Sequence, residues 1–204
     1  MLGNLRETLA PLKSKVATPL ARAGISPNLV SFMAVPTSAL AAYLLVYNHP
    51  LWAFVVGVSS SLFDFVDGEV ARLQNRASAF GNYFEAMVDR MVETILMVGL
   101  AYYYPVLAAS ALGLSLLVSY AKPRVGLVIV TDNRDWPGVG DHSDRMVLIL
   151  GGYLFLPWGL AHYWLGALIA LCFVGFVQRL LYARKLIDEA ERDGNLLPYI
   201  SAEH

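Results

Sequence analysis

Long uncharged stretches constrain the fold of this 204-residue chain more than any other feature. No Asp, Glu, Lys or Arg occurs in the ranges 23–48, 50–63, 94–121 and 146–178. A helix needs about 20 apolar residues to cross the hydrocarbon core of a bilayer. Only 15% of the residues are charged, whereas soluble domains usually carry about 25%. The pattern predicts an all-α integral membrane protein.

Turn signals divide these stretches into six predicted membrane-spanning helices. Their expected ranges are 29–47, 51–73, 81–103, 106–124, 144–158 and 161–186. Pro36 falls inside the first of them, where neighbouring helices can compensate for the lost hydrogen bond. Together they form a predicted bundle over 29–186, followed by a cytoplasmic tail over 187–204. We expect the whole chain, 1–204, to be a single membrane domain.

The segment before the first span, residues 2–23, is predicted to be an amphipathic helix on the inner membrane surface. Leu9, Leu12, Val16 and Leu20 recur at three- and four-residue spacing among basic residues, which is typical of an interfacial helix. Packing of this helix against the cytoplasmic ends of the spans stays open as a second interpretation, and the two are compatible. The segment has no basic region followed directly by an apolar core, so we expect no signal peptide.

The basic residues predict the orientation in the membrane. Three turns, "YNHPLW", "YYYPV" and "PWGLAHYW", contain no Lys or Arg, and all 15 basic residues fall on the opposite side or in the helix ends nearest it. By the positive-inside rule that side is cytoplasmic. We therefore expect a protein of the cell membrane with both termini and the active site facing the cytoplasm. The net charge of −1 gives no sign of a nucleic-acid partner, and the single cysteine, Cys172, excludes a disulfide within the chain.

Four carboxylates lie on two adjoining spans. Asp64 and Asp67 are three residues apart on the second span, and Glu85 and Asp89 are four apart on the third, so each pair shares a helix face. The short polar link makes these spans antiparallel neighbours, and the four side chains can converge in a cleft open to the cytoplasm. A charge inside the membrane costs at least ~2.5–3.5 kcal/mol, and clustered carboxylates repel one another. The cluster therefore predicts a bound hard cation, Mg²⁺ or Mn²⁺.

Small residues accompany the carboxylates. Gly68 and Ala71 extend the face of Asp67 with almost no side chain, and Gly81 lies one turn on the cytoplasmic side of Glu85. Such a bare strip lets a phosphate-bearing ligand approach the backbone, with Arg72 as a cation at the mouth of the cleft. Ion pairing within the membrane accounts for one or two charges only. A divalent-cation transport protein stays an alternative, because intramembrane carboxylates also mark ion pathways, although transport needs no nucleotide-sized strip.

The order D-x-x-D-G-x-x-A-R, eight residues, G-x-x-x-E-x-x-x-D resembles the signature of the CDP-alcohol phosphotransferases. The matching positions are Asp64, Asp67, Gly68, Ala71, Arg72, Gly81 and Asp89. "GISPNLVSF" resembles the elbow that this family has before its first span, and six helices after an amphipathic helix is the architecture of the family. One position departs, because Glu85 stands where the family has a third Asp. Glutamate keeps the charge and both oxygens but is one methylene longer.

The resemblance implies a metal-dependent transfer of a substituted phosphoryl group from a CDP-linked lipid to an alcohol, with release of CMP, in phospholipid biosynthesis. It implies two Mg²⁺ (or Mn²⁺) ions held by Asp64, Asp67, Glu85 and Asp89, with Asp89 as the general base. The implied CDP site consists of Asp67, Gly68, Ala71, Arg72 and Gly81. A homodimer is compatible with the sequence, which does not predict the oligomeric state.

The acceptor is predicted from three basic residues. Lys122 and Arg124 end the fourth span and Arg145 begins the fifth; they resemble the positions with which family members acting on inositol phosphate bind its phosphate. We therefore expect a phosphorylated polyol, with inositol phosphate as the leading acceptor. Anchoring at the membrane edge explains the same residues equally well. Glycerol phosphate, serine or a second lipid as acceptor, and a CDP-polyol as donor, stay open, as does the ester or ether chemistry of the lipid chains.

Overall fold

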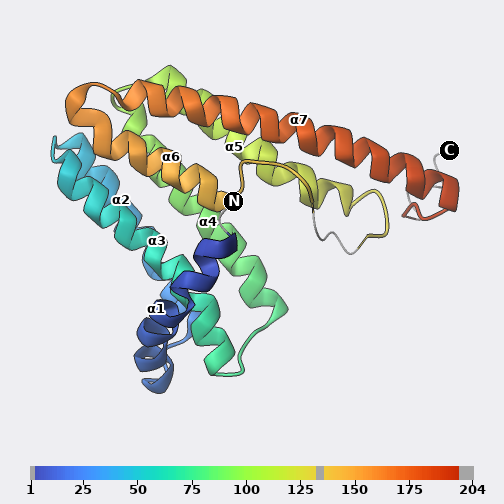
Figure 1. The fold of residues 1–204 in the computed structure, drawn as a ribbon, viewed down its shortest axis with the longest axis horizontal. Coiled ribbons are helices and arrows are strands. Elements are labelled where there is room, and N and C mark those ends of the chain that lie inside the picture. The colour runs from blue at the N-terminus through green and yellow to red at the C-terminus, as the bar shows by residue number, and fades with distance from the viewer. Residues whose placement is uncertain (1–2, 132–135, 198–204) are drawn as a thin grey trace. The chain divides into compact units, whose positions relative to one another are not determined.

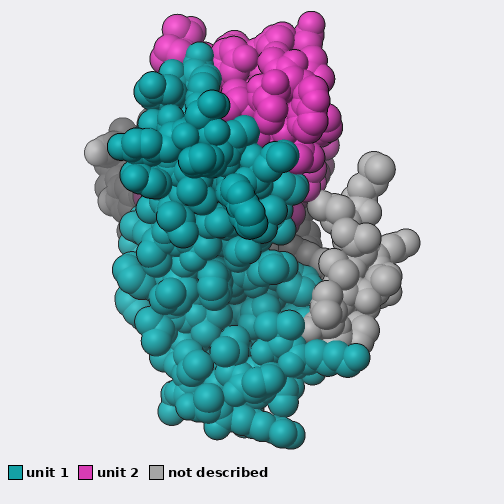
Figure 2. Space-filling model, turned by 90° about the vertical axis from the view of Figure 1, so that its left-hand side faces the viewer, with its two compact units in different colours: residues 1–103 teal, residues 104–204 magenta. Residues whose placement is uncertain are grey.

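The computed structural model describes residues 3–131 and 136–197, which form helices (Figure 1). The described connections between helices are short, except for the one that includes residues 126–131 and 136–141. The chain divides into two compact units, Met1–Tyr103 and Tyr104–His204, which Figure 2 shows in separate colours. Each unit is described by itself below. The prediction of a single domain over 1–204 stays a prediction.

The first unit contains α1 (Gly3–Arg22), α2 (Pro27–Val46), α3 (Pro50–Leu73) and α4 (Ala79–Ala101). α2 packs against both α3 and α4 (Figure 1). The buried positions of α2 include Ala34, Ser38 and Ala41, and those of α3 include Ala53 and Gly57. Small residues at four- and three-residue spacing let helix backbones approach closely, which is the usual way for helices to associate inside a membrane.

α1 packs against α3. Ala17 is fully buried in a cluster with Val66 and Val70, and the side-chain Nε2 of Gln74 donates to the carbonyl oxygen of Ala21 at 3.2 Å. The structure thus has a helix where one was predicted, and this helix packs against α3. The side chains of residues 3–12 and the whole of residue 2 lie outside the described part, so a position on the membrane surface stays a prediction.

The second unit contains α5 (Pro105–Val125), α6 (His142–Phe155), the short 3₁₀ helix η1 (Leu156–Trp158) and α7 (Ala161–Asp193). α7 packs against both α5 and α6 (Figure 1). At Gly151 of α6 the ring of Trp164 occupies the space that a Cβ would fill. The glycine therefore allows an aromatic ring of α7 to lie directly on the α6 backbone.

Each predicted span corresponds to a helix with boundaries a few residues away, except for the last. α7 continues to Asp193, beyond the predicted end at residue 186. The apolar side of this extension packs in a cluster with Val125 and Ile129. Two ion pairs at i,i+4 spacing lie along it, Arg184–Asp188 and Lys185–Glu189, each at 3.8 Å. Residues 187–193 of the predicted tail therefore belong to a helix, and 198–204 lie outside the described residues.

Four of the described helices are long and apolar enough to cross a membrane: α2, α3, α5 and α7. α4 contains 23 residues but carries the charges of Glu85, Asp89, Arg90 and Glu93. α6 contains 14 residues, which corresponds to about 21 Å at 1.5 Å per residue. The structure thus confirms an all-helical fold with apolar helices of membrane-spanning length.

Candidate functional site

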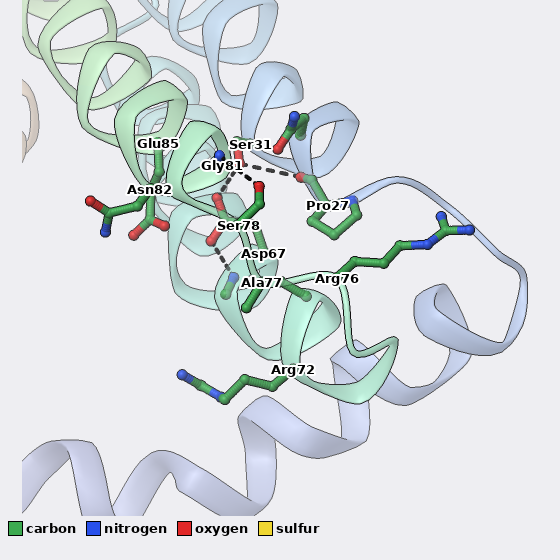
Figure 3. A pocket seen from close by; sticks show the side chains of 13 residues that line it. Pro27, Ser31, Asp67, Arg72, Arg76, Ala77, Ser78, Gly81, Asn82 and Glu85 are labelled. Atoms are coloured by element: carbon green, nitrogen blue, oxygen red, sulfur yellow. Dashed lines mark hydrogen bonds between the residues drawn. The ribbon is translucent and has the colours of Figure 1, made fainter.

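Three helix ends meet around a pocket of about 220 Å³ in the first unit (Figure 3). Two local features bring the start of α4 back to the end of α3. Asn75 follows α3 with φ of 54°, the left-handed conformation that often ends a helix. Ser78 caps α4 by accepting a hydrogen bond from the Gly81 N–H at 3.0 Å. The start of α2 closes the pocket through Pro27 and Asn28.

All five residues predicted to bind CDP line this pocket: Asp67, Gly68, Ala71, Arg72 and Gly81. The other lining residues are Pro27, Asn28 and Ser31 from the first half of α2, and Arg76, Ala77, Ser78, Asn82 and Glu85 from the α3–α4 turn and α4. The structure thus brings the five predicted residues together on the wall of one pocket. The start of α2 also lines it, which the sequence did not predict.

The glycines of the pocket have two different surroundings. A Cβ added to Gly68 would meet nothing within 4 Å, so the backbone there faces open space. A Cβ added to Gly81 would lie 3.2 Å from Ser78 Oγ and 3.6 Å from Asn28 Oδ1. Gly68 thus leaves room for a ligand, whereas Gly81 allows a polar side chain of α2 to approach α4.

Three of the predicted metal ligands converge. Asp64, Asp67 and Glu85 each offer a carboxylate oxygen, and these oxygens lie within 4.8 Å of one another. Asp89 offers an oxygen within 4.8 Å of one on Asp64. Carboxylate oxygens at this separation fit a hard divalent cation, which prefers oxygen ligands. The geometry agrees with the predicted cluster, including the glutamate that departs from the signature.

Ser31 is a contact that the sequence analysis missed. It is 5% exposed, and its hydroxyl donates to Asp67 Oδ2 (Figure 3). The Gly68 N–H donates to Asp67 Oδ1 at 2.5 Å. Both oxygens of Asp67 are therefore held in place by α2 and α3. The only sequence signal was the presence of Ser31 in "GISPNLVSF", which does not indicate a contact 36 residues away.

Arg72 pairs with a residue of its own helix. Its Nη2 lies 2.6 Å from Glu69 Oε2, and its side chain is 63% exposed. In Figure 3 the side chains of Arg72 and Arg76 extend to opposite sides of the pocket. Exposed ion pairs typically contribute only ~0–1 kcal/mol. Arg72 can therefore exchange Glu69 for a ligand phosphate at a small cost in free energy.

Arg90 and Glu93 form an ion pair within α4. Arg90 Nη2 lies 3.4 Å from Glu93 Oε1, and Glu93 is fully buried. The same nitrogen lies 3.6 Å from Asp89 Oδ2. This pairing accounts for charges around Asp89 but leaves the convergence of the other three carboxylates to be explained.

The predicted acceptor residues belong to the second unit and differ in exposure. Lys122 and Arg124 lie in the last turn of α5, half-buried and exposed respectively. Arg145, near the beginning of α6, is 2% exposed. Its Nη1 donates to the Gly140 carbonyl at 2.5 Å, and its Nη2 donates to Ser119 Oγ at 3.2 Å. Arg145 is therefore a buried, well-ordered cation.

Arg179 of α7 is a second buried cation that the sequence analysis did not select. It is 6% exposed and close enough to Arg145 for mutual repulsion. Its Nη2 lies 2.7 Å from Asp141 Oδ1. Its position directly after the uncharged stretch 146–178 did not identify it, because an arginine at the end of an apolar span commonly extends to the membrane interface. The two arginines form an electropositive cluster in the second unit.

Comparison with known proteins gives consistent matches. A family model described as CDP-alcohol phosphatidyltransferase matches residues 24–174. The archaetidylinositol phosphate synthase of Pyrococcus horikoshii is 24% identical over 193 residues, which cover 92% of this chain and 99% of the relative. The phosphatidylinositol phosphate synthase of Mycobacteroides abscessus is 26% identical over 160 residues, covering 74% of this chain and 71% of the relative.

Solved structures share the fold. The phosphatidylinositol phosphate synthase of Mycobacterium tuberculosis with CDP-DAG bound superposes with a TM-score of 0.73 at 23% identity, covering 85% of this chain and 94% of that one. The complex of the same enzyme with manganese and citrate also gives a TM-score of 0.73, at 24% identity, covering 84% of this chain and 88% of that one.

Proposed function

The chain belongs to the CDP-alcohol phosphatidyltransferase family, and from that premise we propose that it transfers a phosphatidyl-type group from a CDP-linked lipid to inositol phosphate. The reaction releases CMP. The observation that carries the proposal is the convergence of Asp64, Asp67 and Glu85 on a pocket with bare backbone at Gly68. Family membership decides between a transferase and a divalent-cation transporter in favour of the transferase.

The carboxylates are the metal ligands in this proposal. Asp64, Asp67, Glu85 and Asp89 hold two Mg²⁺ or Mn²⁺ ions. The oxygens within 4.8 Å of one another support this assignment. Bound ions would neutralise the pyrophosphate and the charge that develops on the leaving group. Ser31 fixes the orientation of Asp67, so the protein supplies a ligand that needs no rearrangement when metal binds.

The donor occupies the pocket between α2, α3 and α4. Gly68 leaves the backbone open to the pyrophosphate, and Ala71 and Gly81 line the pocket beside it. Asp67 belongs to both the metal and the CDP site. Arg72 exchanges its exposed partner Glu69 for a donor phosphate. The lipid chains remain in the bilayer, as expected for a chain with helices of membrane-spanning length.

Asp89 takes the proton of the acceptor hydroxyl. The hydroxyl oxygen forms a bond to the lipid-bearing phosphorus, and the bond from that phosphorus to the bridging oxygen of CMP breaks. CMP leaves with the bridging oxygen and its electron pair. The Nη2 of the neighbouring Arg90 lies 3.6 Å from Asp89 Oδ2.

In this proposal Lys122, Arg124 and Arg145 bind the phosphate of the acceptor, together with Arg179. Arg145 and Arg179 are both buried and donate to the carbonyls of Gly140 and Val139, respectively. Two buried guanidinium groups held at consecutive residues support an anion site. The names of both relatives described above, which are synthases of inositol phosphate lipids, support inositol phosphate as the acceptor.

The proposed membrane arrangement has six spans, two more than the four candidate helices. We propose that α4 and α6 also cross the bilayer, with α1 on its inner surface and the pocket facing the cytoplasm of the cell membrane. The 23 residues of α4 correspond to about 35 Å at 1.5 Å per residue, which is enough to span. Its buried Glu93 pairs with Arg90, as charges inside membranes usually do.

A substitution pair at Glu85 tests its assignment as a metal ligand. Glu85→Gln should reduce CMP release by more than the ~10–100-fold typical of residues that only orient a metal ligand. Glu85→Asp should retain much more activity, because it keeps the charge and both oxygens. The measurement is the rate of CMP release over a range of Mg²⁺ concentrations. Equal, mild losses in both variants would show that Glu85 does not bind metal.

Substitution of the acceptor cations tests the inositol phosphate assignment. Arg124→Ala and Arg145→Ala should each raise the acceptor KM by roughly ten- to a hundred-fold, because a charge-assisted hydrogen bond contributes about 1.5–3 kcal/mol. The donor KM should change little. The measurement is a separate titration of donor and acceptor for each variant. An unchanged acceptor KM in both would refute this assignment and leave the transferase assignment standing.

A further inference from the structure

The segment that leads into α6, residues 138–141, lies along α7 and is called the strap here. The Val139 N–H donates to Gln178 Oε1 at 2.9 Å, and the Val139 carbonyl accepts from Arg179 Nη1 at 3.1 Å. Asp141 accepts from Arg179 Nη2 at 2.7 Å. Two consecutive side chains of α7 thus hold the strap by three hydrogen bonds.

The strap also binds the other buried arginine. The Gly140 carbonyl accepts from Arg145 Nη1 at 2.5 Å. Consecutive carbonyls of the strap therefore bind guanidinium groups from two different helices, α6 and α7. Because Arg145 and Arg179 are buried and repel each other, hydrogen-bond acceptors are needed to keep them in place. The strap supplies acceptors to both.

Glycines specify the path of the strap. The Val139 carbonyl oxygen occupies the space that a Cβ on Gly175 of α7 would fill. Gly138 has φ of 134° and Gly140 has φ of 82°, conformations that other residues rarely adopt. Only a glycine at position 175 lets the strap backbone lie this close to α7 and within reach of Arg179.

Asp141 stands at a position where an aspartate usually caps a helix. It is the N-cap residue of α6, yet its side chain makes no capping hydrogen bond. Its carboxylate instead pairs with Arg179, and its side chain is 74% exposed. Because the Asp141 carboxylate is exposed, its ion pair with Arg179 adds little stability. The contact instead orients the buried guanidinium of Arg179.

We propose that the strap is a positioning element for the acceptor site: Gly175 and Asp141 act through Val139, Gly140 and Arg179 to hold the two guanidinium groups in one phosphate-binding cluster. The inference rests on the proposed function, because it deepens the assignment of the acceptor site. Neither Gly175 nor Asp141 touches the reacting atoms. Their effect is on the affinity for the phosphorylated acceptor.

Gly175→Ala tests the strap, with Gly166→Ala as the matched control. Both glycines lie on α7, but a Cβ at Gly166 would meet nothing within 4 Å. Gly175→Ala should raise the KM for inositol phosphate by roughly tenfold or more, equivalent to the loss of one charge-assisted hydrogen bond. The donor KM and kcat at saturating acceptor should stay within about twofold, and Gly166→Ala should behave as wild type. An unchanged acceptor KM, or an equal rise in both KM values, would overturn the proposal.

Variants of Asp141 keep the proposal testable if Gly175→Ala fails to fold. Asp141→Asn should raise the acceptor KM, and Asp141→Glu should raise it less. Combined with Gly175→Ala, Asp141→Asn should add less than its separate effect, because both act through one contact network. Full additivity, or an acceptor KM that Asp141→Asn leaves unchanged, would contradict the strap as a positioning element.

Arg145→Ala distinguishes failure of the strap inference from failure of the proposed acceptor site. If Arg145→Ala raises the acceptor KM while Gly175→Ala and Asp141→Asn do not, the strap inference falls and the proposed acceptor site stands. If Arg145→Ala is without effect as well, the acceptor site itself is wrong.

Discussion

Chelation of divalent metal with EDTA should reduce CMP release by the purified protein to the rate without enzyme, and added Mg²⁺ or Mn²⁺ should restore it. The reason is the cluster of Asp64, Asp67 and Glu85, whose oxygens lie within 4.8 Å of one another. The donor pyrophosphate is negatively charged and cannot approach these carboxylates without a cation between them. The measurement is CMP release with CDP-lipid and acceptor, before and after chelation. Activity that chelation leaves unchanged would exclude the metal site.

Metal binding can also be measured without turnover. Electron paramagnetic resonance of Mn²⁺ should show two bound ions per chain in the wild type, and Asp67→Asn should lose at least one of them. Asp188→Asn is the control, because Asp188 is an exposed carboxylate of α7 that pairs with Arg184. A single ion in the wild type would contradict the two-ion arrangement. An Asp67→Asn variant with the full number of ions would remove Asp67 from the ligand set.

Asp89→Asn should reduce kcat by roughly 10²–10⁴-fold, the range typical for loss of a general acid–base group. The substitution keeps the size of the side chain but removes the ability to accept the proton of the acceptor hydroxyl. Asp89 is also a proposed metal ligand, so the Mn²⁺ count of the variant should be measured alongside its rate. The assay is single-turnover CMP release at saturating donor and acceptor. A variant that retains more than a tenth of the wild-type rate would show that another group takes the proton.

Much of the fold was predictable because its determinants are local. Uncharged stretches bounded by Pro, Gly and Asn predicted each helix of the bundle except the last to within a few residues. The convergence of Asp64, Asp67 and Glu85 was predictable as well, since spacing fixes a helix face and a short link fixes antiparallel neighbours. The extension of α7 to Asp193 was missed, because residues 187–193 were assigned to a tail. Its i,i+4 ion pairs and the cluster with Val125 stabilise a helix there instead.

The parts of the site that were not predicted depend on contacts between distant segments. Ser31 holds Asp67 across two helices, and no spacing rule joins a residue of α2 to one of α3. The burial of Arg145 and its bond to the Gly140 carbonyl depend on the path of the strap along α7. A sequence pattern locates basic residues at helix ends. It does not show which of them are buried or which backbone carbonyls hold them.

A panel of acceptors tests whether the transfer goes to a phosphorylated polyol. Purified protein with Mg²⁺ and radiolabelled CDP-lipid is offered inositol phosphate, free inositol, glycerol phosphate and serine, and CMP and labelled lipid products are quantified together. Inositol phosphate should give equimolar CMP and a phosphorylated inositol lipid, and the other acceptors should give far lower rates. Equal turnover with free inositol, or a preference for serine, would contradict this assignment.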